Sequence, residues 1–335
     1  MMNKPIAVLI SDVHFSMATL DLAAEAMTQA YKKARKLNVD LIVAGDLHDT
    51  KANLRGECVN RIIDVNKKSQ LAWYVLIGNH DKINEKSEEH ALNFLEPYSY
   101  VVNKVKYLQH INVYLIPYQH DLSALKTILD AIPKHSTLIM HQGLTSALPG
   151  EYTHDKTAAP MEWFAEYRVI SGHYHARQDV KCGRPQKGAV GLFSYIGNPY
   201  TVSFGEHADP PKGFQVLYDD GSLEFVPTNL RKHVKLELPA EGDVTTVGNP
   251  GDLLWIKYSA PRQVLNFVDS HFTKPWTDRG VKVRLDLIPT DEVAVTAPIK
   301  ALKNDELLDA VIDQQGLAAE QKERLKKLWR QLENS

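Results

Sequence analysis

The chain has 335 residues, of which 44% are hydrophobic and 24% charged, as is typical of a soluble globular protein with one large or two ordinary domains. Its formal net charge of −2 excludes a global attraction for nucleic acid, so any such binding must rely on local basic clusters. No apolar run approaches the ~20 residues that span a bilayer, and the N-terminus lacks a signal-peptide pattern. We therefore expect a cytoplasmic protein with no membrane association, in which Cys58 and Cys182 are free thiols.

Apolar runs alternate with helical patterns through the first half of the chain, and this alternation favours a layered α/β domain. Strands are expected at 5–11, 39–44, 71–77, 100–108, 111–118, 137–140, 168–171 and 191–196. Helices are expected at 20–37, 56–67, 88–95 and 122–132. Residues 214–225, interrupted by Asp219-Asp220-Gly221, predict a β-hairpin.

The composition shifts toward Gly, Pro, Thr and Asp over residues 241–252, which indicates a domain boundary. We expect one domain at 1–240 and a second at 241–335. The second domain begins with an expected strand at 253–258, a helix at 262–272 and a strand at 281–287, which together predict a small α+β unit. Residues 304–333 are charged and largely helical in pattern.

Five of the expected strands end in polar side chains that can bind metal ions. Sites form at the carboxyl ends of strands in layered α/β folds, so these five ends should meet in one place. Alternate residues of an extended chain share a face, so the members of each Asp-x-His or His-x-His pair should point the same way. The candidate ligands are Asp12 with His14, Asp46, Asn79, His141, and His173 with His175.

These ligands comprise two carboxylates, one amide and four imidazoles, with no thiolate. Mixed nitrogen and oxygen donors suit Mn²⁺, Fe or Zn²⁺ better than Ca²⁺. The set is too large for one tetrahedral ion and fits two ions that share a carboxylate. A lone Asp-x-His is usually a coincidence, and a lone histidine is more often structural than a ligand, so the ordered set carries the argument.

The order of these motifs resembles the calcineurin-like metallophosphoesterase superfamily over roughly residues 5–235. The motifs are Asp12-x-His14, Gly45-Asp46-x-x-Asp49, Gly78-Asn79-His80-Asp81, His141 and Gly172-His173-x-His175. The resemblance implies an α/β fold with α+β-like layering in four layers, in which a β-sandwich flanked by helices carries a dinuclear site at one edge.

The same resemblance implies a division of labour among the site residues. One metal would be held by Asp12, His14, Asp46 and His175. The other would be held by Asp46, Asn79, His141 and His173, with Asp46 bridging. The ions would clamp a phosphodiester and activate water, while His80, oriented by Asp81, would serve as general acid toward the leaving oxygen.

Four further stretches resemble SbcD-type nucleases: Ala44–Thr50, Tyr195–Pro199, Ser203–Glu206 and Lys212–Phe214. The last three are not needed for the metals, which makes their match more discriminating. The resemblance implies a manganese-dependent DNA nuclease, with Mg, Fe or Zn as alternative metals. It would act as a 3′-to-5′ exonuclease on duplex DNA and as an endonuclease on single strands or hairpins. The family works in recombination and repair with an SbcC-type coiled-coil ATPase, usually as a homodimer, and carries a small C-terminal capping domain.

Some positions depart from this family pattern or allow two interpretations. His48 stands where an aromatic side chain is usual, and we favour a packed role for it over a role behind the metal ligands. Asn198 replaces a small residue. The final helical segment, with Leu325, Leu328 and Leu332 at helical spacing, either binds the ATPase partner or packs on its own domain.

Contacts to DNA are the least defined part of this prediction. The candidate cations are Arg177, Lys181, Arg184 and Lys187, or Arg231, Lys232, His233 and Lys235. Ordinary surface charge is the simpler interpretation of both groups. Tyr118 and Tyr200 could stack on a base, although packing is the more common role for such residues.

Two rival functions share this fold. A phosphoesterase acting on a small substrate or a phosphoprotein would use the same metals, but the stretch 197–214 and the second domain argue against it. A non-catalytic binding subunit would not need the complete ligand set and the His80-Asp81 pair.

Overall fold

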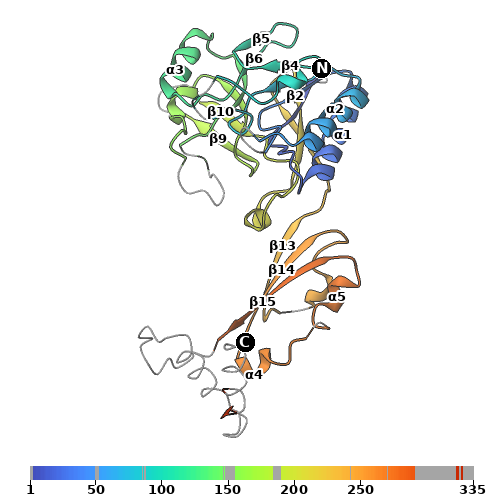
Figure 1. Cartoon of the computed structure of the whole chain (residues 1–335). Helices are drawn as coiled ribbons and strands as arrows, with labels where there is room; N and C mark the ends of the chain where they lie inside the picture. The colour runs from blue at the N-terminus through green and yellow to red at the C-terminus, as the bar shows by residue number, and fades with distance from the viewer. Residues whose placement is uncertain are drawn as a thin grey trace. The chain divides into compact units, whose positions relative to one another are not determined.

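The computed structural model describes residues 3–49, 53–84, 86, 88–145, 147, 155–183, 190–241, 243–269, 271–290, 322, 323 and 326 (Figure 1). The chain divides into two compact units, Met1–Ile288 and Pro289–Ser335. Among the helices in the described ranges, none has both the length and the apolar character of a membrane span. Leu325, Leu328 and Leu332 of the expected terminal helix lie outside the described residues, as do Arg184 and Lys187. The expected domain boundary near residue 240 stays a prediction.

The first sheet has six strands in the order β12-β11-β1-β2-β3-β4. Strands β1 to β4 run parallel, and β11 is antiparallel to β1. Their bounds are β1 Pro5–Ile10, β2 Asp40–Val43, β3 Tyr74–Leu76, β4 Tyr100–Val102, β11 Gly213–Tyr218 and β12 Leu223–Pro227. The parallel order requires crossovers, which α1 (Leu20–Leu37) and α2 (Gly56–Ser69) supply side by side on the sheet (Figure 1).

Helix α1 shows why these crossovers fold as they do. Its buried residues Ala23, Met27, Ala30 and Ala34 recur at helical spacing and pack in one cluster with residues of β1 and β2. The helix ends at Asn38, which adopts the left-handed conformation (φ 54°) and donates its N–H to carbonyls of the last turn.

The second sheet also has six strands, in the order β5-β6-β7-β8-β10-β9. Their bounds are β5 Lys106–Leu108, β6 Val113–Ile116, β7 Thr137–His141, β8 Arg168–Gly172, β9 Gln178–Cys182 and β10 Gly191–Tyr195. Helix α3 (Leu122–Ala131) begins at Asp121, whose side chain accepts the N–H of Ser123. Short 3-10 helices are η1 Asn93–Leu95, η2 Met161–Phe164, η4 Phe204–Ala208 and η5 Val244–Thr246.

The two sheets pack face to face through one apolar layer. This layer includes Leu9 and Ile42 from the first sheet and Leu115, Ile139 and Ile170 from the second. Alternate residues of the same strands face separate outer clusters, so the central strands are buried on both faces. The expected α/β fold, a β-sandwich flanked by helices, is therefore confirmed, and the structure adds that both sheets mix parallel and antiparallel pairs.

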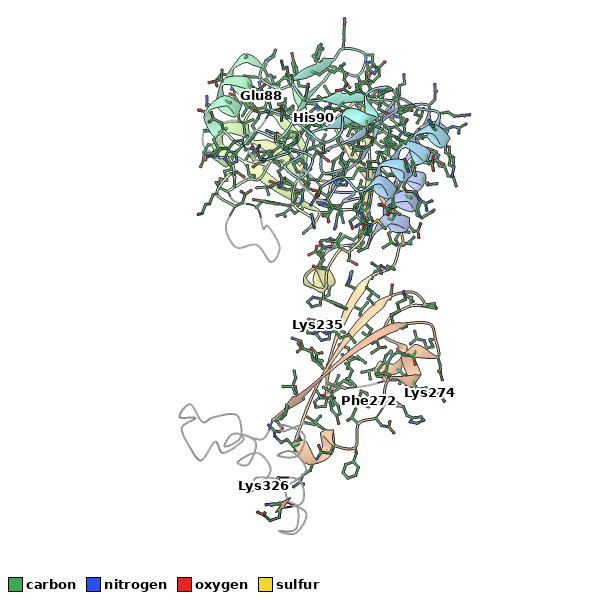
Figure 2. All side chains as sticks on the ribbon, in the orientation of Figure 1. Glu88, His90, Lys235, Phe272, Lys274 and Lys326 are labelled. Atoms are coloured by element: carbon green, nitrogen blue, oxygen red, sulfur yellow. The ribbon has the colours of Figure 1, made fainter. Side chains whose placement is uncertain are left out.

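A third sheet contains β13 (His233–Leu238), β14 (Leu253–Ala260) and β15 (Lys282–Pro289), with short helices α4 (Arg262–Leu265) and α5 (Lys274–Thr277). Its core centres on Leu254, Ile256 and Trp276. Phe272, labelled in Figure 2, stacks on Tyr258 with ring centroids 5.3 Å apart.

Several expected elements differ from the structure. The strand expected at 100–108 is two strands, because β4 pairs with the first sheet and β5 with the second. The helix expected at 262–272 is shorter, because α4 ends at Leu265. Only η1 forms within 88–95. Strands β9 and β13 were not expected, although the alternation of apolar residues in β13 is a readable signal.

Candidate metal centre

The loops after β1 and β2 lie against each other and place the first two motifs. The N–H of Asp12 donates to the carbonyl of Gly45 (3.1 Å), and the N–H of His14 to that of Asp46 (3.0 Å). Strand β1 ends at Ile10, and Asp12, His14 and Asp46 adopt left-handed conformations, with φ of 51°, 49° and 51°. Such conformations are uncommon outside glycine and concentrate at functional sites. Asp12 and His14 point into the same cluster, as expected, but the backbone between them is not extended, because both residues are left-handed.

Two motif glycines make room for these side chains. Gly45 has φ of 92°, and a Cβ on it would lie 2.2 Å from Nδ1 of His141. A Cβ on Gly78 would lie 2.1 Å from Oδ1 of Asp46. Neither position can carry a larger residue without moving a candidate ligand.

Asp12, His14 and His175 form one cluster of donor atoms within 4.8 Å of one another. The Nε2 atoms of the two histidines are 3.1 Å apart. Asp12 is fully buried, and its carboxylate accepts bonds from Ser11 Oγ (2.5 Å) and from the N–H of His173 (3.1 Å to Oδ1). Polar atoms of two buried side chains and the partly exposed His175 thus converge.

Asn79, His141 and His173 form a second group. Oδ1 of Asn79 lies 3.0 Å from Nε2 of His141 and 2.9 Å from Nδ1 of His173. The fully buried His141 donates from Nδ1 to the carbonyl of Ala44 (2.8 Å), which leaves Nε2 free to bind a metal in the neutral ring.

His173 is held from behind by Asp155, a residue that the sequence analysis did not single out. Its Nε2 lies 3.0 Å from Oδ2 of Asp155, so Nδ1 is the nitrogen that faces Asn79. Burial raises the pKa of Asp155, but bonds from His173 and Thr157 outweigh it and hold this pKa well below the usual range. No motif marks Asp155 in the sequence, because its role depends on a loop packing beside β8.

Asp46 lies between the two groups. Its Oδ2 is 3.3 Å from Nε2 of His141 and 3.9 Å from Nε2 of His14, while Oδ1 accepts the N–H of His80 (2.9 Å). Burial raises the pKa of Asp46, yet His141, His80 and His14 outweigh burial and hold it well below the usual value. One Asp46 oxygen thus lies near a histidine of each group.

The imidazoles of His14 and His141 are basic in the metal-free chain. Burial alone would lower their pKa values, but the neighbouring carboxylates outweigh it and raise each pKa to about 9. For His14 the main contributors are Asp49 and Asp46, and for His141 the main contributor is Asp46. The site therefore carries protons that a metal ion would displace.

His80 and Asp81 are not arranged as the sequence analysis expected. Nδ1 of His80 donates to the carbonyl of Asp49 (2.5 Å). The buried Asp81 carboxylate instead accepts the backbone N–H groups of Gly78 (2.9 Å) and His48 (3.0 Å). The expectation that Asp81 orients the His80 ring directly is wrong: Asp81 ties the motif loop to the loop after β2, and Asp49 orients His80.

The remaining candidates lie around the candidate ligands and have packing or hydrogen-bond partners of their own. His48 is buried, as the packed interpretation requires. Tyr200 is buried and donates to the carbonyl of Val13, and the ring of buried Tyr118 stacks on His173. Asn198 and Glu206, from the stretch set aside as unnecessary for the metals, contact each other beside His175.

Two of the basic residues proposed for DNA contact already have protein partners. The guanidinium of Arg177 lies 4.3 Å from the ring centre of Phe225. Lys235, labelled in Figure 2, pairs with Glu237 at 2.7 Å.

Residues 7–205 match the family described as Calcineurin-like phosphoesterase, which is more than half of the chain. The chain belongs to this family. Together with the clusters of His and Asp donors, membership makes it a metal-dependent phosphoesterase that binds divalent metal ions. This calcineurin-like phosphoesterase is also similar to a crystal structure of the Pseudomonas putida nuclease MPE, with 16% identity and a TM-score of 0.34 over 66% of this chain and 87% of that one. A search of curated proteins finds no match.

Proposed function

We propose that this phosphoesterase is a two-metal phosphodiesterase that cleaves DNA. The observation that carries the two-metal part is the position of Asp46, whose Oδ2 lies 3.3 Å from His141 and 3.9 Å from His14. These histidines belong to different donor groups, so one carboxylate reaches both. Two sites sharing a carboxylate are the arrangement that in-line displacement at phosphorus uses.

The donor set fits divalent ions such as manganese, because it combines carboxylate, amide and neutral imidazole atoms. Asp12, His14, Asp46 and His175 would hold one ion, and Asp46, Asn79, His141 and His173 the other. When bound, the ions would supply Lewis-acid stabilisation of the phosphodiester and a more acidic water. The remaining steps belong to side chains of the protein.

His80 is the proposed general acid toward the leaving oxygen. Its Nδ1 is occupied by the carbonyl of Asp49, so Nε2 is the atom that can present a proton. The backbone N–H of His80 donates to Asp46, which holds the ring beside the donor groups. The ring centroids of His14 and His80 are 4.9 Å apart, so the acid lies next to the first donor group.

DNA is the proposed substrate because the stretches 44–50, 195–199, 203–206 and 212–214 resemble SbcD-type nucleases. On this proposal the chain acts as a 3′-to-5′ exonuclease and as an endonuclease on single strands or hairpins, with manganese as its metal. An SbcC-type coiled-coil ATPase would be its partner in recombination and repair, and it would form a homodimer. Residues 241–335 would be its capping domain.

A cleavage assay tests this proposal. The purified chain with Mn²⁺ is given a 5′-labelled duplex, a DNA hairpin and a chromogenic phosphodiester in parallel, with Asp46→Ala as the inactive control. We expect Mn²⁺-dependent cleavage of the hairpin and shortening of the duplex from the 3′ end, both lost in the control. Hydrolysis of the small ester with intact DNA would refute the nuclease assignment and favour a small-substrate phosphodiesterase.

A further inference from the structure

Residues 198–212 span the stretches that resemble SbcD-type nucleases beyond the metal motifs. They also contact His175, a proposed metal ligand. Oε1 of Glu206, in η4, lies 2.6 Å from Nδ1 of His175. A carboxylate at this nitrogen fixes the ring orientation and leaves the proton on Nδ1, so Nε2 carries the lone pair that faces His14. Glu206 and His175 are 31 residues apart in the chain, so only folding brings them together.

The second oxygen of Glu206 is held as firmly as the first. Oε2 accepts bonds from Nδ2 of Asn198 (3.0 Å) and the N–H of Val202 (3.1 Å), and it lies 3.2 Å from Nζ of Lys212. Contacts to both carboxylate oxygens therefore leave Glu206 a single available orientation.

Lys212 contacts both Glu206 and His175. Its ammonium donates to the backbone carbonyl of His175 (3.0 Å) and to Oδ2 of Asp209 (2.6 Å), and its side chain is 8% exposed. The ring of His175 is thus held by Glu206 while its backbone is held by Lys212. We call Glu206 and Lys212 the His175 clamp.

The clamp is attached to the third sheet through the helix that carries Glu206. Phe204, two residues earlier in η4, packs its ring 4.8 Å from that of His233 in β13 and 5.5 Å from that of Trp255 in β14. The N–H of His233 also donates to Oγ1 of Thr201 (2.8 Å). One short element therefore contacts the third sheet with one residue and a candidate ligand with another.

We propose that Glu206 and Lys212 are positioning residues that set the orientation and donor strength of His175, and that Phe204 links this clamp to the third sheet. The inference rests on the proposed role of His175 as a metal ligand. It assigns the stretch 198–212 a task in metal binding that is separate from any contact with DNA.

Metal titration of the metal-free chain tests the clamp without using catalysis. Co²⁺ is added in competition with a chromogenic chelator, and its visible absorption is recorded. The variants are Glu206→Ala, Glu206→Gln, Lys212→Met and Phe204→Ala, with Glu237→Gln as the matched surface control because that carboxylate contacts only Lys235 among the ion pairs of the described residues.

We expect Glu206→Ala to weaken binding of one of two ions by about 10- to 100-fold and to alter its spectrum, as loss of a carboxylate behind a metal-bound histidine does. The ion held by Asn79, His141 and His173 serves as the internal reference and should keep its affinity. Glu206→Gln keeps an oxygen for His175 but turns its amide toward donors, so its loss should be intermediate. Lys212→Met should also weaken that ion, Phe204→Ala should do so to a smaller extent, and Glu237→Gln should match the wild type.

Unchanged Co²⁺ affinities and spectrum in folded Glu206→Gln and Lys212→Met would overturn the clamp, even if the melting temperature of the metal-free variants fell. A wild-type chain that binds two ions but leaves DNA intact would refute only the nuclease proposal. A wild-type chain that binds fewer than two ions would refute the metal assignment and the clamp with it.

Discussion

The Nε2 atoms of His14 and His175 lie 3.1 Å apart, and the Nδ1 atom of each ring faces a carboxylate, Asp49 for His14 and Glu206 for His175. Two neutral rings with protons on Nδ1 would point lone pairs at each other, which is unfavourable unless a cation or a proton lies between them. The Nε2 atoms of His14 and His175 are therefore placed to bind a cation together.

Replacing His175 with alanine removes half of this pair. We expect the metal content to fall from two ions to one per chain, because Asp46, Asn79, His141 and His173 remain to hold the other. Elemental analysis after gel filtration measures this, with His271→Ala as the control for a histidine that is 77% exposed. Two ions retained by His175→Ala would contradict the assignment.

His80→Ala should keep both ions and lose most of its turnover, since the ring donates to Asp49 and its backbone N–H, which the variant retains, binds Asp46. Loss of a general acid typically costs about 10²- to 10⁴-fold in rate. Steady-state kinetics with metal analysis on the same sample give both numbers.

Asp81→Ala should differ from His80→Ala in its effect, because the Asp81 carboxylate accepts two backbone N–H groups and does not contact the His80 ring. It should lower the free energy of unfolding by about 1–3 kcal/mol, the cost of leaving buried donors unpaired. If His80→Ala kept full activity, the general-acid role would be wrong.

Gly78→Ala tests whether the close approach to Asp46 matters. The backbone at Gly78 is not left-handed, but a Cβ there would meet Oδ1 of Asp46 at 2.1 Å and the backbone nitrogen of Asp46 at 2.4 Å, so the carboxylate and the loop that carries it must both shift. We expect weaker binding of both ions, approaching the loss in Asp46→Ala. Isothermal titration with Mn²⁺ checks this, with Gly56→Ala as the control, since a Cβ there meets nothing within 4 Å. Normal affinity in Gly78→Ala would show that Asp46 is free to move.

Metal affinity should rise with pH in the metal-free chain. The pKa values of His14 and His141 are raised to about 9 by surrounding carboxylates, despite the opposing effect of burial, so both rings are protonated at pH 7. A metal must displace these protons, and affinity should increase about tenfold per pH unit for each proton displaced. Mn²⁺ titrations between pH 6.5 and 9 measure the slope, and a flat profile would contradict it.

The same shifts have the opposite effect on the stability of the metal-free fold. A histidine whose pKa is raised in the folded state stabilises that state below its unfolded pKa of 6.5. This contribution is lost as pH rises through about 9. The melting temperature without metal should therefore fall over that range, and saturation with Mn²⁺ should reverse the trend.

The sequence by itself determined the layered α/β class and the identity of the candidate ligands. Both follow from local information: apolar runs specify the central strands, and Asp46, Asn79 and His141 come directly after or at the ends of such runs. Strand ends at one edge of a sheet lie close together, so the grouping of Asp46 with Asn79 after the first sheet and of His141 with His173 after the second was predictable. The packing of the two sheets then brings these two halves into one site.

Only the tertiary structure decided how those ligands are held. Asp155 and Glu206 reach His173 and His175 from 18 and 31 residues away, across loops whose course no local pattern specifies. The role of Asp81 was misassigned for the same reason, because a carboxylate next to a histidine in sequence points wherever the backbone turns it. Hydrogen-bond partners depend on packing between segments, whereas strand ends depend on the segments themselves, and this separates what the sequence could predict from what it could not.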